Sequence, residues 1–287
     1  MHIVTDRAAD LSSEQAQGLD IHYAPLTFTL DNKTYSSGVD VQPDDFYQMI
    51  AATESFPTTS QPAPGEFAEL YRRLAKTDPE ILSIHISSGL SGTLDSARQG
   101  AALVPEARVT FVDTKTLSGA EGWQVEAAAR AAKAGWSKEK IVAMLERISA
   151  ATDTIYTLAT LKYLIHGGRI SHLKGLMAQV LDLKPIIGVE KVEGKYASIT
   201  QARTLEKAIR KIPEHIASMH PEGTPMRAQI MHAFNPDGAE RLRESMNQLF
   251  KCEWLPVGPI APVLGAHTGP TLVGVAYAPI ATYPQLP

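Results

Sequence analysis

The first half of the chain alternates short apolar segments with helical patterns, and this alternation limits the folds that it can adopt. Residues 81–87 and 108–114 are apolar runs of strand length. A helical pattern follows each run, beginning near Leu94 and near Glu121. Residues 65–76 precede the first run and place four apolar side chains on one helical face: Phe67, Leu70, Tyr71 and Leu74. The alternation predicts a mainly parallel sheet with helices on its faces.

The second half of the chain predicts a different arrangement. Residues 185–190 and 196–200 flank a glycine turn and indicate a β-hairpin, and later segments alternate between helix and strand: 203–217, 227–233, 238–250 and 271–278. The total of 287 residues exceeds what one hydrophobic core usually supports. We therefore expect the α/β class, with an N-terminal mainly parallel α/β domain at residues 1–155. A smaller α/β (α+β) C-terminal domain is expected at residues 156–287.

Charge and cysteine content exclude several classes of protein. The formal net charge is -4 and the chain has no long basic run, so we expect no nucleic-acid partner. The single cysteine, Cys252, excludes an internal disulfide and a cysteine-rich zinc site. The first residues lack the pattern of a signal peptide, and no apolar stretch approaches the ~20 residues of a membrane span. The expected location is cytoplasmic, without stable membrane insertion.

Motifs for bound metals and nucleotides are also missing from the sequence. The histidines form no HExxH pattern, and no carboxylate cluster has metal-ligand spacing. Neither GxxxxGK[ST] nor GxGxxG occurs, so the chain shows no nucleotide site of its own. We expect no metal and no cofactor.

The segment from Ile86 to Leu94 follows a buried strand and opens a helix. Backbone N–H groups at such a helix start attract anions, and the glycines at 89 and 92 would let a ligand come close. Ser91 is expected to cap the helix. An ordinary strand–turn–helix connection with a serine cap is the alternative interpretation.

Three further segments carry polar groups in positions that suit a ligand. Residues 57–64 hold hydroxyls, Thr59 among them, on a proline-stiffened extended chain. After the helical pattern that Gly167 is expected to end, the double glycine presents Arg169, which suits an anion or a partner surface. His267 lies in a turn before the last strand. As single features, these residues also have simpler explanations: an ordinary turn loop, a solvated arginine and, more often than a ligand contact for a lone histidine, a structural hydrogen-bonding group.

Taken together, these segments resemble the DegV family of fatty-acid-binding proteins, which includes the acyl-binding subunit of bacterial fatty acid kinase. The similar motifs occur in the family's order along the chain: Val4–Leu11, Thr59–Pro64, Ile86–Thr93, Val112–Lys115, Gly167–Ser171, Leu183–Ile186 and His267–Pro270. Any one of these motifs is weak evidence, whereas the ordered set is specific.

The resemblance implies a two-domain protein that binds a long-chain fatty acid through its carboxylate. Carried over by position, Thr59 and Ser91 would hydrogen-bond the carboxylate, N–H groups near Gly92 would assist, and His267 would lie close by. A separate ATP-binding fatty acid kinase subunit would phosphorylate the bound acid, and Arg169 would engage that partner. The chain itself would then be a lipid-binding protein without catalytic residues.

The chemistry agrees with this interpretation. A buried carboxylate needs donors that offset a desolvation cost of several kcal/mol, and uncharged hydroxyls at a helix start can supply them. Burial of the tail would add about 0.8 kcal/mol per CH₂ group.

Two other classes of function compete with fatty-acid binding. Ser91, Asp113 and His267 occur in the order of an α/β-hydrolase triad, so a serine hydrolase is the alternative. Against it, Thr93 stands where G-x-S-x-G requires its second glycine. A scaffold or regulatory protein that holds lipid only as a structural filler is a third class. Exchange of the bound acid for a competitor would argue against such a filler.

Overall fold

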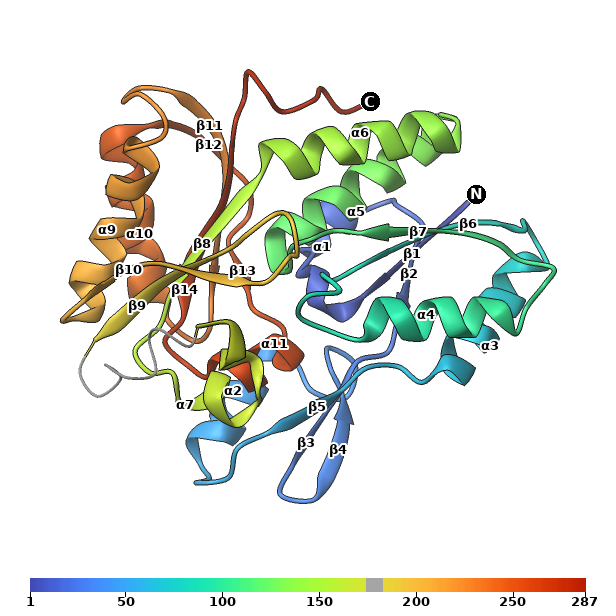
Figure 1. Ribbon diagram of the computed structural model, residues 1–287, viewed down its shortest axis with the longest axis horizontal. Coiled ribbons are helices and arrows are strands. Elements are labelled where there is room, and N and C mark those ends of the chain that lie inside the picture. Colours follow the sequence, from blue (N-terminus) through green and yellow to red (C-terminus); the bar gives the residue numbers. More distant parts are fainter. Residues whose placement is uncertain (174–182) are drawn as a thin grey trace.

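A four-stranded parallel sheet forms the centre of the N-terminal half (Figure 1). The computed structural model describes residues 1–173 and 183–287. The strand order is β2-β1-β6-β7, with β1 (His2–Asp6), β2 (Ile21–Ala24), β6 (Glu80–His85) and β7 (Arg108–Asp113). The mainly parallel sheet predicted from the alternating pattern is confirmed.

Helices cover both faces of this sheet, because its strands are apolar on both sides. Val4 and Ile81 pack with the first pair of helices, α3 (Pro64–Ala75) and α4 (Thr93–Ala102). Ile3, Leu82 and Ile84 face the second pair, α5 (Ser118–Lys133) and α6 (Lys138–Ala151). The four apolar residues predicted on one face of the helix at 65–76 are all buried.

A mixed sheet dominates the C-terminal half. Its path is β10-β9-β8-β14-β11-β12, with β13 beside β11. Its strands are β8 (Asp153–Thr157), β9 (Lys184–Val189), β10 (Tyr196–Ala202), β11 (Pro225–His232), β12 (Lys251–Trp254), β13 (Gly258–Pro259) and β14 (Val273–Pro279). The predicted hairpin is the antiparallel pair β9–β10, so the α+β character of this half is confirmed.

The two faces of this mixed sheet have different neighbours. Along β14, Val273, Val275 and Tyr277 pack in one core with two helices, α9 (Leu205–Ala217) and α10 (Pro236–Leu249). Ala276 and Ala278, which alternate with them, pack against Trp123 of α5 in the N-terminal half. The domain boundary near residue 155 stays a prediction: that position lies inside β8, which belongs to the mixed sheet.

A third, antiparallel sheet lies below the two halves in Figure 1 and was not predicted. Its order is β4-β3-β5, formed by β3 (Thr27–Leu30), β4 (Lys33–Ser36) and β5 (Thr58–Ser60). It shares one apolar core with three helices: α2 (Pro43–Ala51), α7 (Lys162–His166) and α11 (Pro262–Thr268). This core therefore joins residues from both halves of the chain.

Short helical turns complete the described structure. They are η1 (Arg7–Ala9), α1 (Ser13–Ala16) and η2 (Arg169–Leu173). Within residues 1–173 and 183–287, no helix combines the length and the apolarity that a membrane crossing requires.

Candidate functional site

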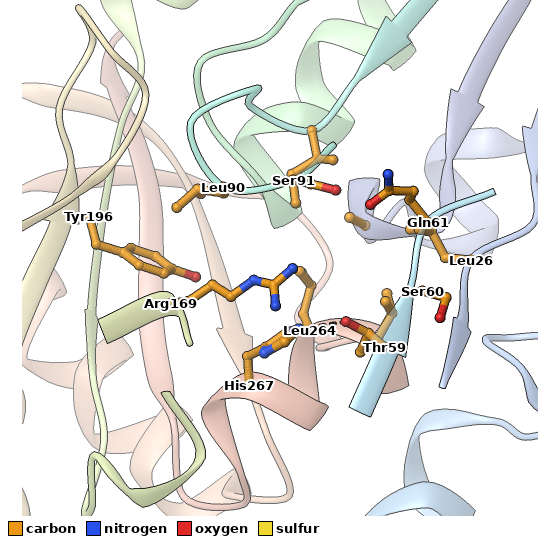
Figure 2. A pocket seen from close by; sticks show the side chains of 13 residues that line it. Leu26, Thr59, Ser60, Gln61, Leu90, Ser91, Arg169, Tyr196, Leu264 and His267 are labelled. Carbon is orange, nitrogen blue, oxygen red and sulfur yellow. Dashed lines mark hydrogen bonds between the residues drawn. The ribbon is translucent and has the colours of Figure 1, made fainter. Parts of the chain in front are cut away.

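A pocket lies where the third sheet, the start of α4 and the C-terminal half meet (Figure 2). Its cavity volume is about 40 Å³, and the pocket is partly open to solvent. One part of its wall is apolar: Ala8, Leu26, Ile86, Leu90, Val263 and Leu264. The rest is polar: Thr59, Ser60, Gln61, Ser91, Arg169, Tyr196 and His267. Four residues singled out in the sequence, Thr59, Ser91, Arg169 and His267, thus line one pocket.

Thr59 and His267 form a direct pair across the pocket floor. Thr59 Oγ1 on β5 lies 2.7 Å from His267 Nε2 on α11. The other ring nitrogen, Nδ1, is buried without a hydrogen-bond partner among the described residues. It faces Gly167, where an added Cβ would lie only 2.1 Å from Nδ1, so this position requires glycine. A proton on Nδ1 would have no acceptor, and we therefore assign the proton to Nε2.

This tautomer leaves the hydroxyl proton of Thr59 available. Nε2–H of His267 donates to Thr59 Oγ1, so the Thr59 hydroxyl can donate to a ligand oxygen. Burial, together with the positive charge of Arg169, lowers the pKa of His267 from 6.5 to about 4. The imidazole is therefore neutral at physiological pH.

Ser91 lies in the loop before α4, but it is not the residue that caps the helix. The N-cap is Gly92, which makes no side-chain cap bond, and Ser91 Oγ accepts instead from Thr93 N–H at 3.2 Å. The predicted serine cap is therefore wrong by one position. Ser91 Oγ also lies 2.8 Å from Thr93 Oγ1, so the threonine hydroxyl can donate to Ser91 and leave the serine proton for a ligand.

Gly92 does not line the pocket, although the resemblance implies a role for nearby N–H groups. A Cβ at this position would lie 2.7 Å from Gln61 Nε2, so glycine allows the amide to approach the α4 loop. Gln61 lines the pocket and was not singled out from the sequence, although it belongs to the same short motif as Thr59. Tyr196 on β10 also lines it, and no sequence signal indicated that position.

Arg169 reaches into the middle of the pocket, between Ser91 and His267 in Figure 2. One of its guanidinium nitrogens, Nη1, donates to the carbonyl of Gly167 at 2.7 Å. The residue with positive φ after α7 is Gly168, with φ 73°, whereas Gly167 remains right-handed. Gly167 is the C-cap of α7, so the helix ends where the sequence predicted, and the left-handed residue is the next one. The partner-binding role of Arg169 stays a prediction.

Arg169 is the one side chain with a permanent charge among the residues that line the pocket. No carboxylate of the described residues forms an ion pair with it. Its charge favours the phenolate of Tyr196, yet burial dominates and raises the pKa of that phenol to about 12. The pocket thus presents one cation and several neutral hydroxyl, amide and imidazole groups. This combination suits a ligand with one negative charge.

The serine hydrolase alternative is not supported, because its three residues do not form a triad. His267 Nε2 pairs with Thr59, and Nδ1 has no carboxylate partner in the described structure. Asp113 lies in another cluster, where it accepts from Ser88 Oγ at 2.5 Å and pairs with Lys115 at 3.0 Å. Ser91 therefore lacks the base and the orienting acid that a nucleophile needs.

Comparison with protein families agrees with this geometry. The profile described as "Uncharacterised protein, DegV family" matches residues 1–280. A DegV domain-containing protein of Staphylococcus aureus is 34% identical over 273 residues, which cover 95% of this chain and 96% of the relative. Another, from Deinococcus radiodurans, is 32% identical over 260 residues and covers 91% of this chain and 90% of the relative.

Solved structures show the same fold along nearly the whole chain. A DegV family protein of Thermus thermophilus, described by its fatty acid binding, has 31% identity and a TM-score of 0.88, with 97% of this chain and 99% of that chain covered. DegV of Bacillus subtilis, described as a fatty acid binding protein, has 29% identity and a TM-score of 0.86, with 96% and 98% covered. The predicted family and its two α/β parts are confirmed, and the chain belongs to the DegV family.

Proposed function

We propose that this chain binds a long-chain fatty acid and holds its carboxylate in the pocket lined by Thr59, Ser91 and His267. The observation that supports this most strongly is the 2.7 Å contact between Thr59 Oγ1 and Nε2 of the neutral His267, which leaves the Thr59 hydroxyl able to donate to a ligand. The fatty acid binding described for the relatives from Thermus thermophilus and Bacillus subtilis agrees with it. The apolar part of the wall would receive the first methylene groups of the tail.

We further propose that Arg169 contacts the carboxylate. Its guanidinium lies in the pocket without an acidic partner among the described residues. A charge-assisted hydrogen bond would help to offset the desolvation of the ligand. The sequence indicated only uncharged donors for the carboxylate. Arg169 would add one positively charged donor to them. Arg169 was also predicted to contact a kinase partner. It can make both contacts only if the fatty-acid carboxylate lies near the protein surface.

Competition between ligands tests the binding proposal. The purified chain is stripped of lipid, and a fluorescent fatty acid is displaced by palmitic acid or by its methyl ester. Because the ester lacks the anionic headgroup, we expect the acid to displace the probe at a concentration at least about tenfold lower. Equal displacement by acid and ester would contradict carboxylate recognition. Mass spectrometry of organic extracts from the native protein identifies the acyl chain.

A separate experiment tests whether the chain is a subunit that presents the acid to an ATP-dependent fatty acid kinase. We expect acyl phosphate only when an ATP-binding kinase subunit is added to the loaded chain. Arg169→Gln separates the two roles of the arginine. A loss of about tenfold or more in acid affinity supports the carboxylate contact. Unchanged affinity with slower turnover in the presence of the kinase subunit would instead support the partner role alone.

A further inference from the structure

A second group of polar side chains lies at the edge where β1 and β2 begin. The two strands are parallel, and Val4 pairs with His22. His2 is two positions before Val4, so His2 and His22 lie on the same face of the sheet. Asp20 directly precedes β2. One potential ligand atom from each of these three residues lies within 4.8 Å of the others.

The spacing of His22 and Asp20 suits a shared ion better than a direct bond. His22 Nε2 lies 3.5 Å from Asp20 Oδ1, and this nitrogen is buried without a hydrogen-bond partner in the described structure. Two ligands that each lie about 2.0–2.1 Å from a tetrahedral zinc ion are about 3.4 Å apart. The observed distance is close to that ligand–ligand separation.

The orientation of His2 is determined by Thr77. The Thr77 hydroxyl lies 2.9 Å from Leu74 O and 2.9 Å from His2 Nε2. Because a carbonyl can only accept, the hydroxyl proton goes to Leu74, and Thr77 must accept from Nε2–H of His2. The other nitrogen, Nδ1, then keeps its lone pair. Ligating histidines characteristically donate their second N–H in this way.

The charges around the group leave the imidazoles able to bind a cation. Histidine binds a metal ion through an unprotonated ring nitrogen. Asp20 contributes a negative charge and is 80% exposed, and Asp78 lies close enough to His2 to interact electrostatically. Two positive charges oppose cation binding, those of Arg73 and of the Met1 ammonium that pairs with Asp78, and the two carboxylates offset them.

We propose that His2, Asp20 and His22 bind one divalent transition-metal ion of the zinc class, with water in the remaining coordination position. Imidazole and carboxylate ligands suit Zn²⁺, Ni²⁺ and Cu²⁺. The site is distinct from the fatty-acid pocket, because none of its three residues lines that pocket. Metal binding there would link the starts of β1 and β2. Asp20 and His22 are two positions apart, whereas His2 lies 18 positions before Asp20, so sequence spacing alone does not indicate the site.

Calorimetric titration of the full chain with Zn²⁺ tests this proposal. The protein carries no histidine tag and is freed of metal by a chelator beforehand. We expect one saturable site per chain, together with the visible absorption bands of tetrahedral cobalt when Co²⁺ replaces Zn²⁺. His22→Gln should weaken Zn²⁺ binding by about tenfold or more, since a tetrahedral site loses one of its three protein ligands.

Two further variants keep the test decisive. Asp20→Asn changes an exposed side chain, so the variant should fold normally, and it should also weaken zinc binding. His215→Gln, a half-buried histidine on α9, is the matched control and should bind zinc as the unaltered chain does. The proposal is overturned if zinc does not bind with one-to-one stoichiometry, or if Asp20→Asn and His22→Gln both bind like His215→Gln.

Discussion

At the scale of single residues, the proposed carboxylate site depends on the pair formed by Thr59 and His267. The two side chains are 208 positions apart in sequence, yet their polar atoms lie 2.7 Å from each other. The neutral ring accepts no proton near neutral pH and fixes the direction of the Thr59 hydroxyl. In the proposed function, a threonine held in this way donates to the carboxylate of the ligand.

Removal of that single hydroxyl should weaken ligand binding. Thr59→Val keeps the shape of the side chain and removes the donor, so we expect the affinity for palmitic acid to fall by about 1–2 kcal/mol, or roughly five- to thirtyfold. Thr58→Val alters an exposed neighbour on the same strand and should leave affinity unchanged. Displacement of a fluorescent fatty acid measures both variants. Equal affinities of the two variants would contradict the role of Thr59.

The depressed pKa of His267 predicts a specific response of stability to acid. The folded ring has a pKa of about 4 against 6.5 when exposed, so below about pH 6.5 the unfolded chain binds a proton that the folded chain does not. The stability contribution is thus lost as the pH falls from about 6.5 to about 4, and it amounts to about 3 kcal/mol.

Urea unfolding at several pH values measures this contribution. The free energy of unfolding of the unaltered chain should fall more steeply over that interval than that of His267→Gln. His215→Gln should follow the unaltered chain, because it leaves His267 in place. Parallel curves for the unaltered chain and His267→Gln would show that the ring is not buried in its neutral form.

At the scale of elements, the β9–β10 hairpin contacts the loop that carries Ser91. Ser87 Oγ donates to the carbonyl of Gly194 at the hairpin turn, at 2.7 Å. A Cβ at Gly89 would lie 2.3 Å from the Glu193 carbonyl oxygen, so the two segments touch through backbone. This contact holds the loop before α4 in place beside the pocket.

Gly89→Ala should therefore force the hairpin and the α4 loop apart. We expect a loss of about 1–3 kcal/mol in the free energy of unfolding and weaker fatty-acid binding, because overpacked backbone must move. Gly65→Ala is the control, since nothing lies within 4 Å of an added Cβ there. As a residue of α3, an alanine at position 65 should be neutral or stabilise by up to about 1 kcal/mol. Chemical denaturation compares the two variants, and equal stabilities would contradict the close contact.

Elements with strong local patterns could be predicted, whereas those that depend on distant partners could not. The parallel sheet, its helices and the β9–β10 hairpin follow from apolar periodicity and glycine turns. The β3–β4 hairpin was missed, although Asp31 and Asn32 both have the positive φ typical of its two-residue turn. That dipeptide lacks the glycine by which such turns are usually recognised. The pocket role of Tyr196 depends on tertiary packing alone, so its sequence neighbourhood contains no sign of it.

At the scale of the whole molecule, the pocket brings together residues from the two halves of the chain, and each half also has hydrophobic cores of its own. Thr59 and Ser91 come from the N-terminal half, and Arg169, Tyr196 and His267 come from the C-terminal half. The core around the pocket likewise combines β3, α2, α7 and α11. A ligand seated there contacts both halves at once, so its binding energy depends on their correct arrangement.

Fatty acid should consequently stabilise the chain as one unit. At a free concentration about a hundredfold above Kd, a ligand that binds only the folded state adds about 2.7 kcal/mol to the free energy of unfolding. We expect both far-ultraviolet circular dichroism and tryptophan fluorescence to shift to higher urea by the same amount. Trp123 in the N-terminal half and Trp254 in the C-terminal half place fluorescent reporters on both sides. The methyl ester, without a carboxylate, should shift the transition much less. If part of the unfolding transition stayed at its original urea concentration, the ligand would stabilise one half alone, and the pocket would not couple the two.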